Sequence, residues 1–288
     1  MRRTTKIFLY ILFALATFSI FIYVRFPAEM VEDAVSQEVA RFGADVAVEA
    51  AVIRPAFPPG VKLMPLLVNY ADQPFLRMDY LKITPDLRSF FTSSQRYACY
   101  AGIGSGELKG RAETSAEGSR VRSKIALTLN RVPLDYIEFL TQWKNYRPHG
   151  DLDATISFDS IKGGGTADIH LEISPARIEF EPPLMGIEAL DFTLFKSQLV
   201  ATQRMLQIKN CDAIGDQIEG KISGSIIFRD PIEDSPVTLT LTVKPQPAFI
   251  AYHKNDMIGG LLSNANAQKR GVVFRISGTL TNPRYVIR

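Results

Sequence analysis

Cysteine and histidine are the residue types in this chain best suited to nucleophilic or metal-binding chemistry. The 288 residues include two cysteines, Cys99 and Cys211, and three histidines, His149, His170 and His253. None has the short spacing of metal ligands, so the sequence predicts no metal or cofactor site. In an oxidising compartment the two cysteines predict a disulfide between Cys99 and Cys211, with two buried free thiols as the alternative.

Other motifs that resemble catalytic ones have structural explanations. Gly163–Gly165 lacks the Gly-Lys-Ser/Thr ending of a phosphate-binding loop and lies between two alternating segments, which predicts a hairpin turn. Asp151 and Asp153 fall on the polar face of an expected strand, where carboxylates are common. No Gly-x-Ser-x-Gly elbow and no set of serine, histidine and acid stands out. We therefore expect a protein that is not an enzyme.

The charge of the chain is concentrated at its N-terminus. The net charge is +3, and Arg2, Arg3 and Lys6 supply three positive charges, so the remainder is formally neutral. A neutral chain lacks the basic face that nucleic-acid binding requires. We therefore expect no nucleic-acid partner.

The segment 7–24 contains no charged residue and is followed by Arg25. A helix of this length covers ~27 Å, close to the ~30 Å hydrocarbon core of a bilayer. The preceding cations favour a cytoplasmic N-terminus. Residues 1–25 are therefore expected to form a cytoplasmic tail and a single transmembrane anchor in a bacterial inner membrane, with the C-terminal domain in the periplasm. A signal peptide cleaved after Ala16 is the alternative.

The remaining sequence divides by its hydrophobic period. Residues 26–43 have apolar side chains at helical spacing, begin with Pro27 and end with Gly43, which predicts an amphipathic stalk helix. From residue 44 the period changes to two. Residues 44–288 are therefore expected to form a periplasmic β-rich domain.

Related segments recur in this domain, each opening with a glycine and alternating apolar residues. They begin at Gly106, Gly150 and Gly220, and each is followed by a turn and a returning strand that meets a proline soon afterwards: Pro133, Pro175 and Pro245. The copies are unevenly spaced. This pattern predicts an array of antiparallel hairpins and not a regular solenoid.

Alternation in these strands separates an apolar face from a polar one. Leu152, Ile156 and Phe158 alternate with Asp151, Asp153, Thr155 and Ser157, for example. Such a pattern is typical of a sheet with one face in water. The residues expected on the apolar face, as the wall of a groove, are Leu152, Ile156, Phe158, Ile169, Leu171, Ile173, Ile222, Ile226, Leu239, Leu241, Phe274 and Ile276.

The expected helices are too few to cover this apolar face. Only the segments 133–143 and 247–262 have helical patterns in the β-rich domain. A sheet of eight or more strands must therefore curl on itself, pack as a two-layer sandwich, or hold an apolar ligand. The fold class expected is mainly β, with a curled, mostly antiparallel sheet and a few short helices. A sandwich is the commonest alternative.

Several motifs together resemble a known family. The N-terminal anchor is followed by FPPGV at 57–61, LKITPDL at 81–87, the Gly-x-Ile-x-Gly strand at 220–224 and FRISGTLTNP at 274–283. This order resembles the type II secretion system protein N family, which in turn is similar to the AsmA-like envelope proteins. The similarity extends over nearly the whole chain, and its motifs belong to the fold and not to a catalytic site.

The resemblance implies an inner-membrane-anchored periplasmic accessory component of the type II secretion system, with a structural or assembly role and other secretion subunits as partners. The similarity to AsmA-like proteins implies an alternative, a lipid-binding or lipid-transfer protein with a half-barrel or groove. Its partner would be phospholipid. Both functions are expectations at this point.

Overall fold

The computed structural model describes residues 46–70, 72–117, 120–141, 145–161, 165–184, 186–231, 234–253 and 271–287, together with positions 6, 9–14, 17, 21 and 30. Most of the expected anchor (1–25) and of the expected stalk helix (26–43) therefore lies outside the described residues. Residues 9–14 are helical. Among the described residues, no helix has the length and apolar character needed to cross a bilayer.

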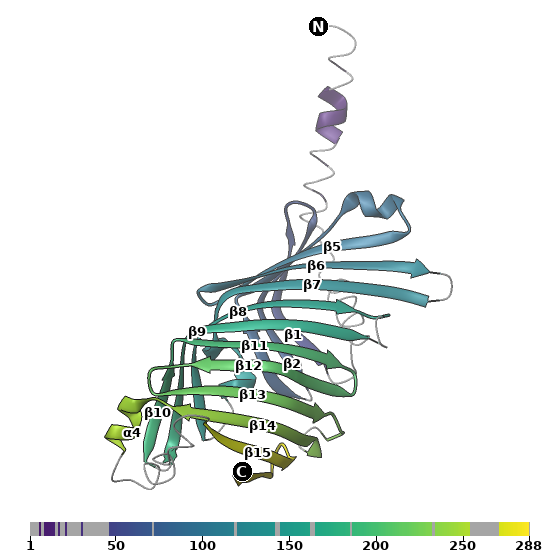
Figure 1. Cartoon of the computed structure of the whole chain (residues 1–288). Coiled ribbons are helices and arrows are strands. Elements are labelled where there is room, and N and C mark those ends of the chain that lie inside the picture. Colours follow the sequence, from purple (N-terminus) through teal and green to yellow (C-terminus); the bar gives the residue numbers. More distant parts are fainter. Residues whose placement is uncertain are drawn as a thin grey trace.

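The domain is built almost entirely of antiparallel strands (Figure 1). The strands are β1 (Val46–Ala56), β2 (Gly60–Tyr70), β3 (Gln73–Met78), β4 (Tyr80–Pro85), β5 (Ser94–Ile103), β6 (Gly106–Glu117), β7 (Arg120–Pro133), β8 (Tyr146–Asp159), β9 (Thr166–Leu184), β10 (Ile187–Phe192), β11 (Leu194–Thr202), β12 (Met205–Ile214), β13 (Ile218–Ile227), β14 (Pro236–Pro245), β15 (Val272–Thr279) and β16 (Pro283–Ile287). The described helices are η1 (Leu87–Phe91), η2 (Leu134–Tyr136), α3 (Glu138–Thr141) and α4 (Pro247–Tyr252).

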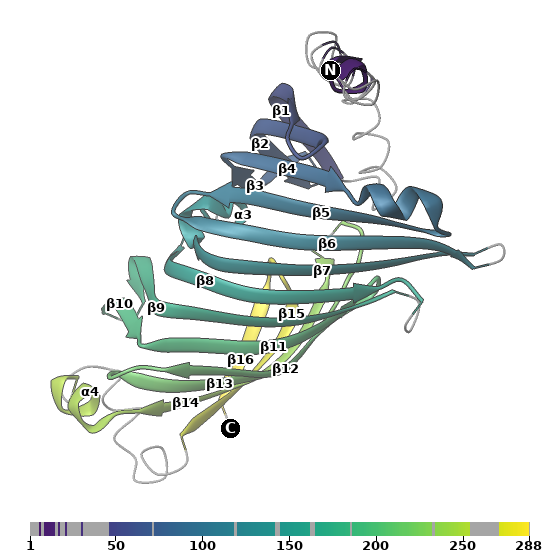
Figure 2. The same ribbon diagram turned by 90° about the horizontal axis from the view of Figure 1, so that it is seen from above.

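All 16 strands belong to one sheet, in the order β1-β2-β4-β5-β6-β7-β8-β9-β11-β12-β13-β14-β15-β16, with β3 attached to β2 and β10 to β9. The sheet is strongly curved and open, because β1 and β16 are not paired with each other (Figure 2). The prediction of a mainly β, antiparallel domain with a few short helices is confirmed. The alternative of a sandwich made of two separate sheets is wrong, since neighbouring strands stay hydrogen-bonded throughout.

The strand connections alternate between two rims of the sheet. The η1 rim carries η1 and the turns that join β1–β2, β6–β7, β8–β9, β11–β12, β13–β14 and β15–β16. The α4 rim carries η2, α3, β10 and α4, on the opposite side in Figure 2. The added elements are therefore concentrated on the α4 rim, while the η1 rim consists mainly of short turns.

Two expected boundaries differ in the structure. β7 and β14 end at Pro133 and Pro245 as predicted, but β9 continues past Pro175 to Leu184. Pro175 lies where the register with β8 shifts between Gly150 and Leu152, so its missing N–H falls at an irregularity of the ladder. Beyond this point β9 pairs with β10, which extends the strand toward the α4 rim.

The main core forms where the middle strands of the curved sheet pack against its first strands. Leu63 and Leu66 of β2 and Met78 of β3 form one cluster with Ile103, Val132 and other side chains of β5–β8. Figure 1 shows β1 and β2 running behind the central strands. Since each strand has one apolar face, this contact removes the inner surface of the N-terminal half from water.

Candidate functional site

The residues predicted to form an apolar wall all lie on one face of the sheet. Directly opposed residues of antiparallel strands point to the same face. Leu152 pairs with Ile173, and Ile156 with Ile169. Ile222 pairs with Leu241, which pairs with Phe274. We call this surface the inner face, because it is the side on which β1–β3 pack.

Four rows of side chains cross the inner face from β8 to β15, and no charged residue interrupts them. They read Leu152, Ile173, Phe195, Ala213, Gly220, Val243 and Val272; Ala154, Leu171, Ser197, Cys211, Ile222, Leu241 and Phe274; Ile156, Ile169, Leu199, Ile208, Gly224, Leu239 and Ile276; and Phe158, Ala167, Ala201, Leu206, Ile226, Val237 and Gly278. The twelve predicted residues are thus brought together as one surface.

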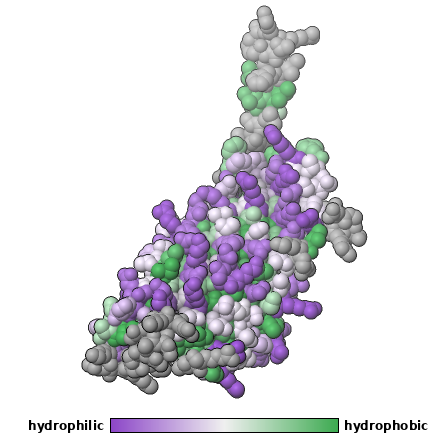
Figure 3. Space-filling model, viewed as in Figure 1, coloured by the Kyte–Doolittle hydropathy of each residue, from purple (hydrophilic) through white to green (hydrophobic). Residues whose placement is uncertain are grey.

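The opposite face is polar and carries cross-strand charge pairs. Lys196 lies 3.7 Å from Glu172, and Lys221 lies 3.7 Å from Asp212. These contacts are exposed and contribute little to stability, but they keep the outer face wet. Polar side chains dominate the face of the strands seen in Figure 3. The two faces therefore differ sharply in chemistry.

Coverage of the inner face changes along the sheet. In the N-terminal half, the inner residues Leu63, Ala101 and Ile103 are almost fully buried. In the C-terminal half, by contrast, the large residues of the two middle rows are only half-buried and lie outside the core clusters. These are Ile169, Leu199, Ile208, Ile222, Leu239, Leu241 and Ile276. The described residues therefore leave a stretch of apolar inner face incompletely covered.

Two smaller clusters close the α4 rim of this stretch. Phe192 of β10 packs with Ala176 and Ala213. Phe249 of α4 packs with Val272, and Leu190 of β10 contacts both clusters. This incompletely covered stretch is therefore bounded on one side by β10 and α4.

Strands β11 and β12 complete the rows, although no sequence motif identified them. Phe195 and Leu199 alternate in β11, but Ser197 breaks the apolar pattern between them. In β12 the register shifts between Ile208 and Cys211, so the inner residues change from even to odd numbers. A bulge of this kind hides the period of two.

The predicted disulfide is not formed, and both cysteines are free thiols. Cys99 lies on β5 and Cys211 on β12, six positions apart in the sheet. At ~4.8 Å per strand, the path along the sheet between these two strands is ~29 Å. Burial in the inner face raises the pKa of Cys99, and it raises the pKa of Cys211 to about 11. Neither thiol is therefore poised for reaction.

The histidines have separate environments. His149 lies 3.3 Å from Asp135 and 3.6 Å from Glu179 near the α4 rim. His170 is exposed, and His253 is buried against Phe249 with ring centroids 4.5 Å apart. Within the described parts of the chain, no three His, Cys, Asp or Glu side chains are grouped to hold a metal ion.

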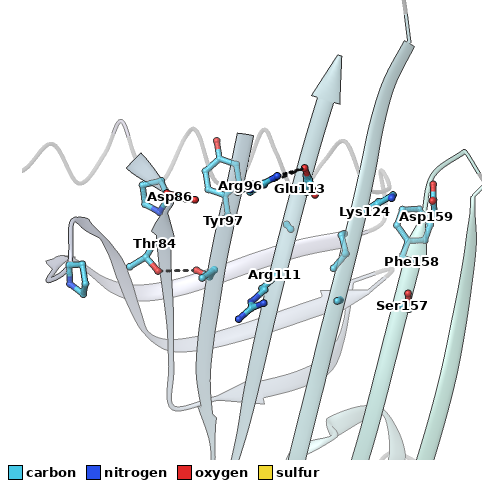
Figure 4. Close-up of a pocket in the computed structure, with 16 residues that line it drawn as sticks. Thr84, Asp86, Arg96, Tyr97, Arg111, Glu113, Lys124, Ser157, Phe158 and Asp159 are labelled. Atoms are coloured by element: carbon cyan, nitrogen blue, oxygen red, sulfur yellow. Dashed lines mark hydrogen bonds and ion pairs between the residues drawn. The ribbon is translucent and has the colours of Figure 1, made fainter. Parts of the chain in front are cut away.

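A cavity of about 810 Å³, lined by both apolar and charged residues, lies at the η1-rim ends of β4–β8. Its lining includes the inner-face residues Tyr97 and Phe158 and the outward-facing Arg96 and Glu113, which form an ion pair of 3.3 Å (Figure 4). Asp159 accepts a hydrogen bond from Arg122 at 2.8 Å, and this bond is the main reason that the pKa of Asp159 falls to about 2.

This cavity pairs acids with bases and contains no nucleophile beside a base. Its other lining groups include the outward-facing cations Arg111 and Lys124. Lys124 lies between Glu113 and Asp159 across the strands and helps to lower the pKa of Asp159. Across these strands the outward-facing side chains alternate in charge, from Arg96 and Glu113 to Lys124 and Asp159.

No protein-family model, curated protein or solved structure matches this chain.

Proposed function

We propose that the chain binds the acyl chains of a phospholipid, or of an amphiphile of similar chemistry, along the uncovered inner face. The observation that carries this proposal is the set of four rows from β8 to β15 without a charged side chain. Half-buried Leu and Ile side chains gain free energy when a ligand removes them from water, at ~25 cal/mol per Å² of apolar surface.

The chemistry of this surface favours hydrocarbon over a polar ligand. The buried hydroxyl of Ser197 donates to the backbone oxygen of Asn210, so it is already satisfied. A polar ligand would lose its hydration here without gaining partners. An amphiphile avoids this cost if its head group stays in water at the rim of the sheet, outside the apolar rows. In this proposal the sheet acts as a half-barrel groove of the AsmA-like kind.

Native mass spectrometry of the full chain, extracted in detergent and supplied with phospholipid, tests the groove. We expect phospholipid adducts that weaken when Ile222 and Leu239 are both replaced by Gln. Each apolar side chain contributes on the order of 1 kcal/mol when a ligand covers it, so the double variant should lose adducts roughly tenfold. The matched control replaces Ser223 and Thr240, their outward-facing neighbours, by Gln. Equal adducts in both double variants would contradict the proposal.

A second function concerns the type II secretion system. The motifs that resemble protein N form real elements, since the strand 220–224 lies in β13 and the segment 274–283 forms β15, a turn and the start of β16. The edge strand β16 also exposes Tyr285 and Val286, which offer a surface for a partner subunit. We therefore keep as the alternative an accessory component, anchored in the inner membrane with its domain in the periplasm.

In-cell crosslinking followed by a pull-down distinguishes the two functions. The structural role would be favoured if secretion subunits crosslink to a chain that carries a crosslinkable residue in place of Tyr285, and if no lipid adducts are found. Lipid adducts that depend on Ile222 and Leu239 would favour the groove. Loss of protein export without any lipid phenotype on deletion would also support the structural role.

A further inference from the structure

Two exposed aromatic side chains protrude from the η1 rim at the first strands of the sheet. Phe57 lies in the turn between β1 and β2, and Phe91 ends η1, between β4 and β5. Because β2 and β4 are antiparallel neighbours that pair Val61 with Ile83, these two connections lie at the same end of the strands. The sheet therefore presents both rings at one corner.

The exposure of these side chains is unusually high for apolar residues. Phe91 is 93% exposed, Phe57 is 90% exposed and Leu87, also in η1, is 52% exposed. Single exposed apolar residues are common on soluble surfaces, but three at one corner indicate an interaction site.

Hydrogen bonds hold both connections in place, so the rings do not belong to frayed ends. Lys82 donates from Nζ to the backbone oxygen of Phe57 at 2.6 Å. In η1, Asp86 accepts from the backbone N–H of Arg88, and the buried hydroxyl of Ser89 donates to the backbone oxygen of Asp86. The hydroxyl of Ser89 also accepts from the backbone N–H of Arg96. The two protrusions are therefore built features of the fold.

Positive charge accumulates beside these rings. Arg54, Lys62 and Lys82 are direct cross-strand partners on the outer faces of β1, β2 and β4. Like charges placed opposite each other destabilise a sheet, so this row has a cost within the chain itself. The ammonium of Lys62 lies 4.5 Å from the centre of the Tyr80 ring. None of the three has an acidic partner in the described part of the chain, and neither does Arg88.

We infer that this corner rests on an anionic bilayer surface, with Phe57, Leu87 and Phe91 in the interfacial region and the cations against lipid phosphates. Aromatic side chains suit the boundary between head groups and hydrocarbon, and each nearby cation gains energy from an anionic surface. The rings stand on separate protruding turns, a shape that enters a fluid lipid layer more readily than a preformed protein pocket. The inference stands independently of lipid binding in the groove.

Depth-dependent quenching tests this contact with the full chain. Trp143, the single tryptophan, is first replaced by Phe. Phe57→Trp, Phe91→Trp and Tyr252→Trp are then made separately, and each full-length variant is reconstituted into phosphatidylcholine vesicles containing phosphatidylglycerol and lipids brominated near the carbonyl end. Tyr252 is 84% exposed on α4, at the opposite rim, so it serves as the matched control.

We expect bromolipid to quench the tryptophans at 57 and 91 and to leave the one at 252 nearly unquenched. Replacing both Arg54 and Arg88 by Gln should lower the ratio of docked to undocked chains roughly thirtyfold at low ionic strength. Quenching at 57 and 91 no greater than at 252 would overturn the inference, as would quenching insensitive to loss of both arginines. A protection of these positions that appears only with a protein partner, and not with vesicles, would also overturn it.

Discussion

At the scale of single residues, the effect of a substitution on stability depends mainly on which face of the sheet the side chain points to. Ile156 and Thr155 are neighbours in β8, but Ile156 packs against the core cluster and Thr155 is exposed. The alternation continues into β9, where Ile169 faces inward opposite Ile156 and His170 faces outward opposite Thr155. A polar substitution therefore has very different consequences at two adjacent positions.

The first prediction compares Ile156→Asp with Thr155→Asp. A carboxylate at 156 would lie among apolar side chains without a partner, which should lower the free energy of unfolding by ~2–4 kcal/mol. The same group at 155 should change it by less than ~0.5 kcal/mol. Urea unfolding followed by circular dichroism measures both. Similar losses at the two positions would mean that the assigned faces are wrong.

At the scale of strands, irregular positions keep the two faces continuous. β11 shifts register between Gln198 and Leu199, and β12 between Ile208 and Cys211. Gly224 lies opposite Ile208 beside this second shift, with a φ of 142°. Bulges add curvature and twist, and the glycine tolerates a backbone conformation that other residues rarely adopt. The bend of β12–β13 therefore depends on this residue.

The second prediction compares two glycines of β13. A Cβ at position 224 would lie 2.2 Å from the backbone oxygen of Thr238, whereas one at 220 would meet only the Cβ of Ala213, at 3.5 Å. We expect Gly224→Ala to lower the free energy of unfolding by ~1–3 kcal/mol because of steric contact and backbone strain. Gly220→Ala should be neutral or stabilising by up to ~1 kcal/mol, because its Cβ fits and the unfolded chain loses flexibility. Thermal melts of both variants provide the measurement; a larger loss for Gly220→Ala would refute this reading of the bend.

At the scale of the whole molecule, the sheet is an open meander in which most strands pair with their neighbours in sequence. The two exceptions are small, since β3 and β10 attach to the side of the path. Contacts between adjacent strands dominate such an array, so its stability is approximately a sum of local terms, as in repeat proteins. The described end of the sheet at β16 should open most easily.

The third prediction concerns hydrogen exchange along this sheet. Among the described strands, β16 pairs with β15 alone, whereas β8 is flanked by long ladders to β7 and β9. Amides of β16 should therefore exchange at least ~tenfold faster than those of β8 under native conditions. Hydrogen–deuterium exchange with mass spectrometry resolves the two segments. Equal protection would indicate that another strand or partner covers β16.

Resemblance to secretion protein N and the two functional proposals also belong to this scale. An open sheet with an apolar inner face can serve as a lipid groove, and its free edge can serve as a docking strand. The Gln variants at 222 and 239 test the first role, and crosslinks at β16 test the second. The proposed contact of Phe57 and Phe91 with a bilayer is a separate question, which the tryptophan variants test.

The two faces of the sheet could be predicted from the sequence, because the alternation of side chains is a local property of an extended chain. All twelve predicted apolar-wall residues share one face, from Leu152 in β8 to Ile276 in β15. The hairpin nature of residues 150–173 also followed from local turn chemistry. Most of the expected anchor and stalk helix lies outside the described residues, so those segments stay predictions.

The covered part of the apolar face and the positions of the cysteines depend instead on how the strands are arranged in space. Leu63 and Leu66 cover the inner side of later strands because the sheet curves, and its curvature depends on twist and bulges summed over many strands. The intervening strands separate Cys99 from Cys211 for the same reason, since sequence spacing does not reveal how many strands stand between two positions. The exposed rings of Phe57 and Phe91 likewise lie at one corner because β2 pairs with β4, although β3 stands between these strands in the sequence.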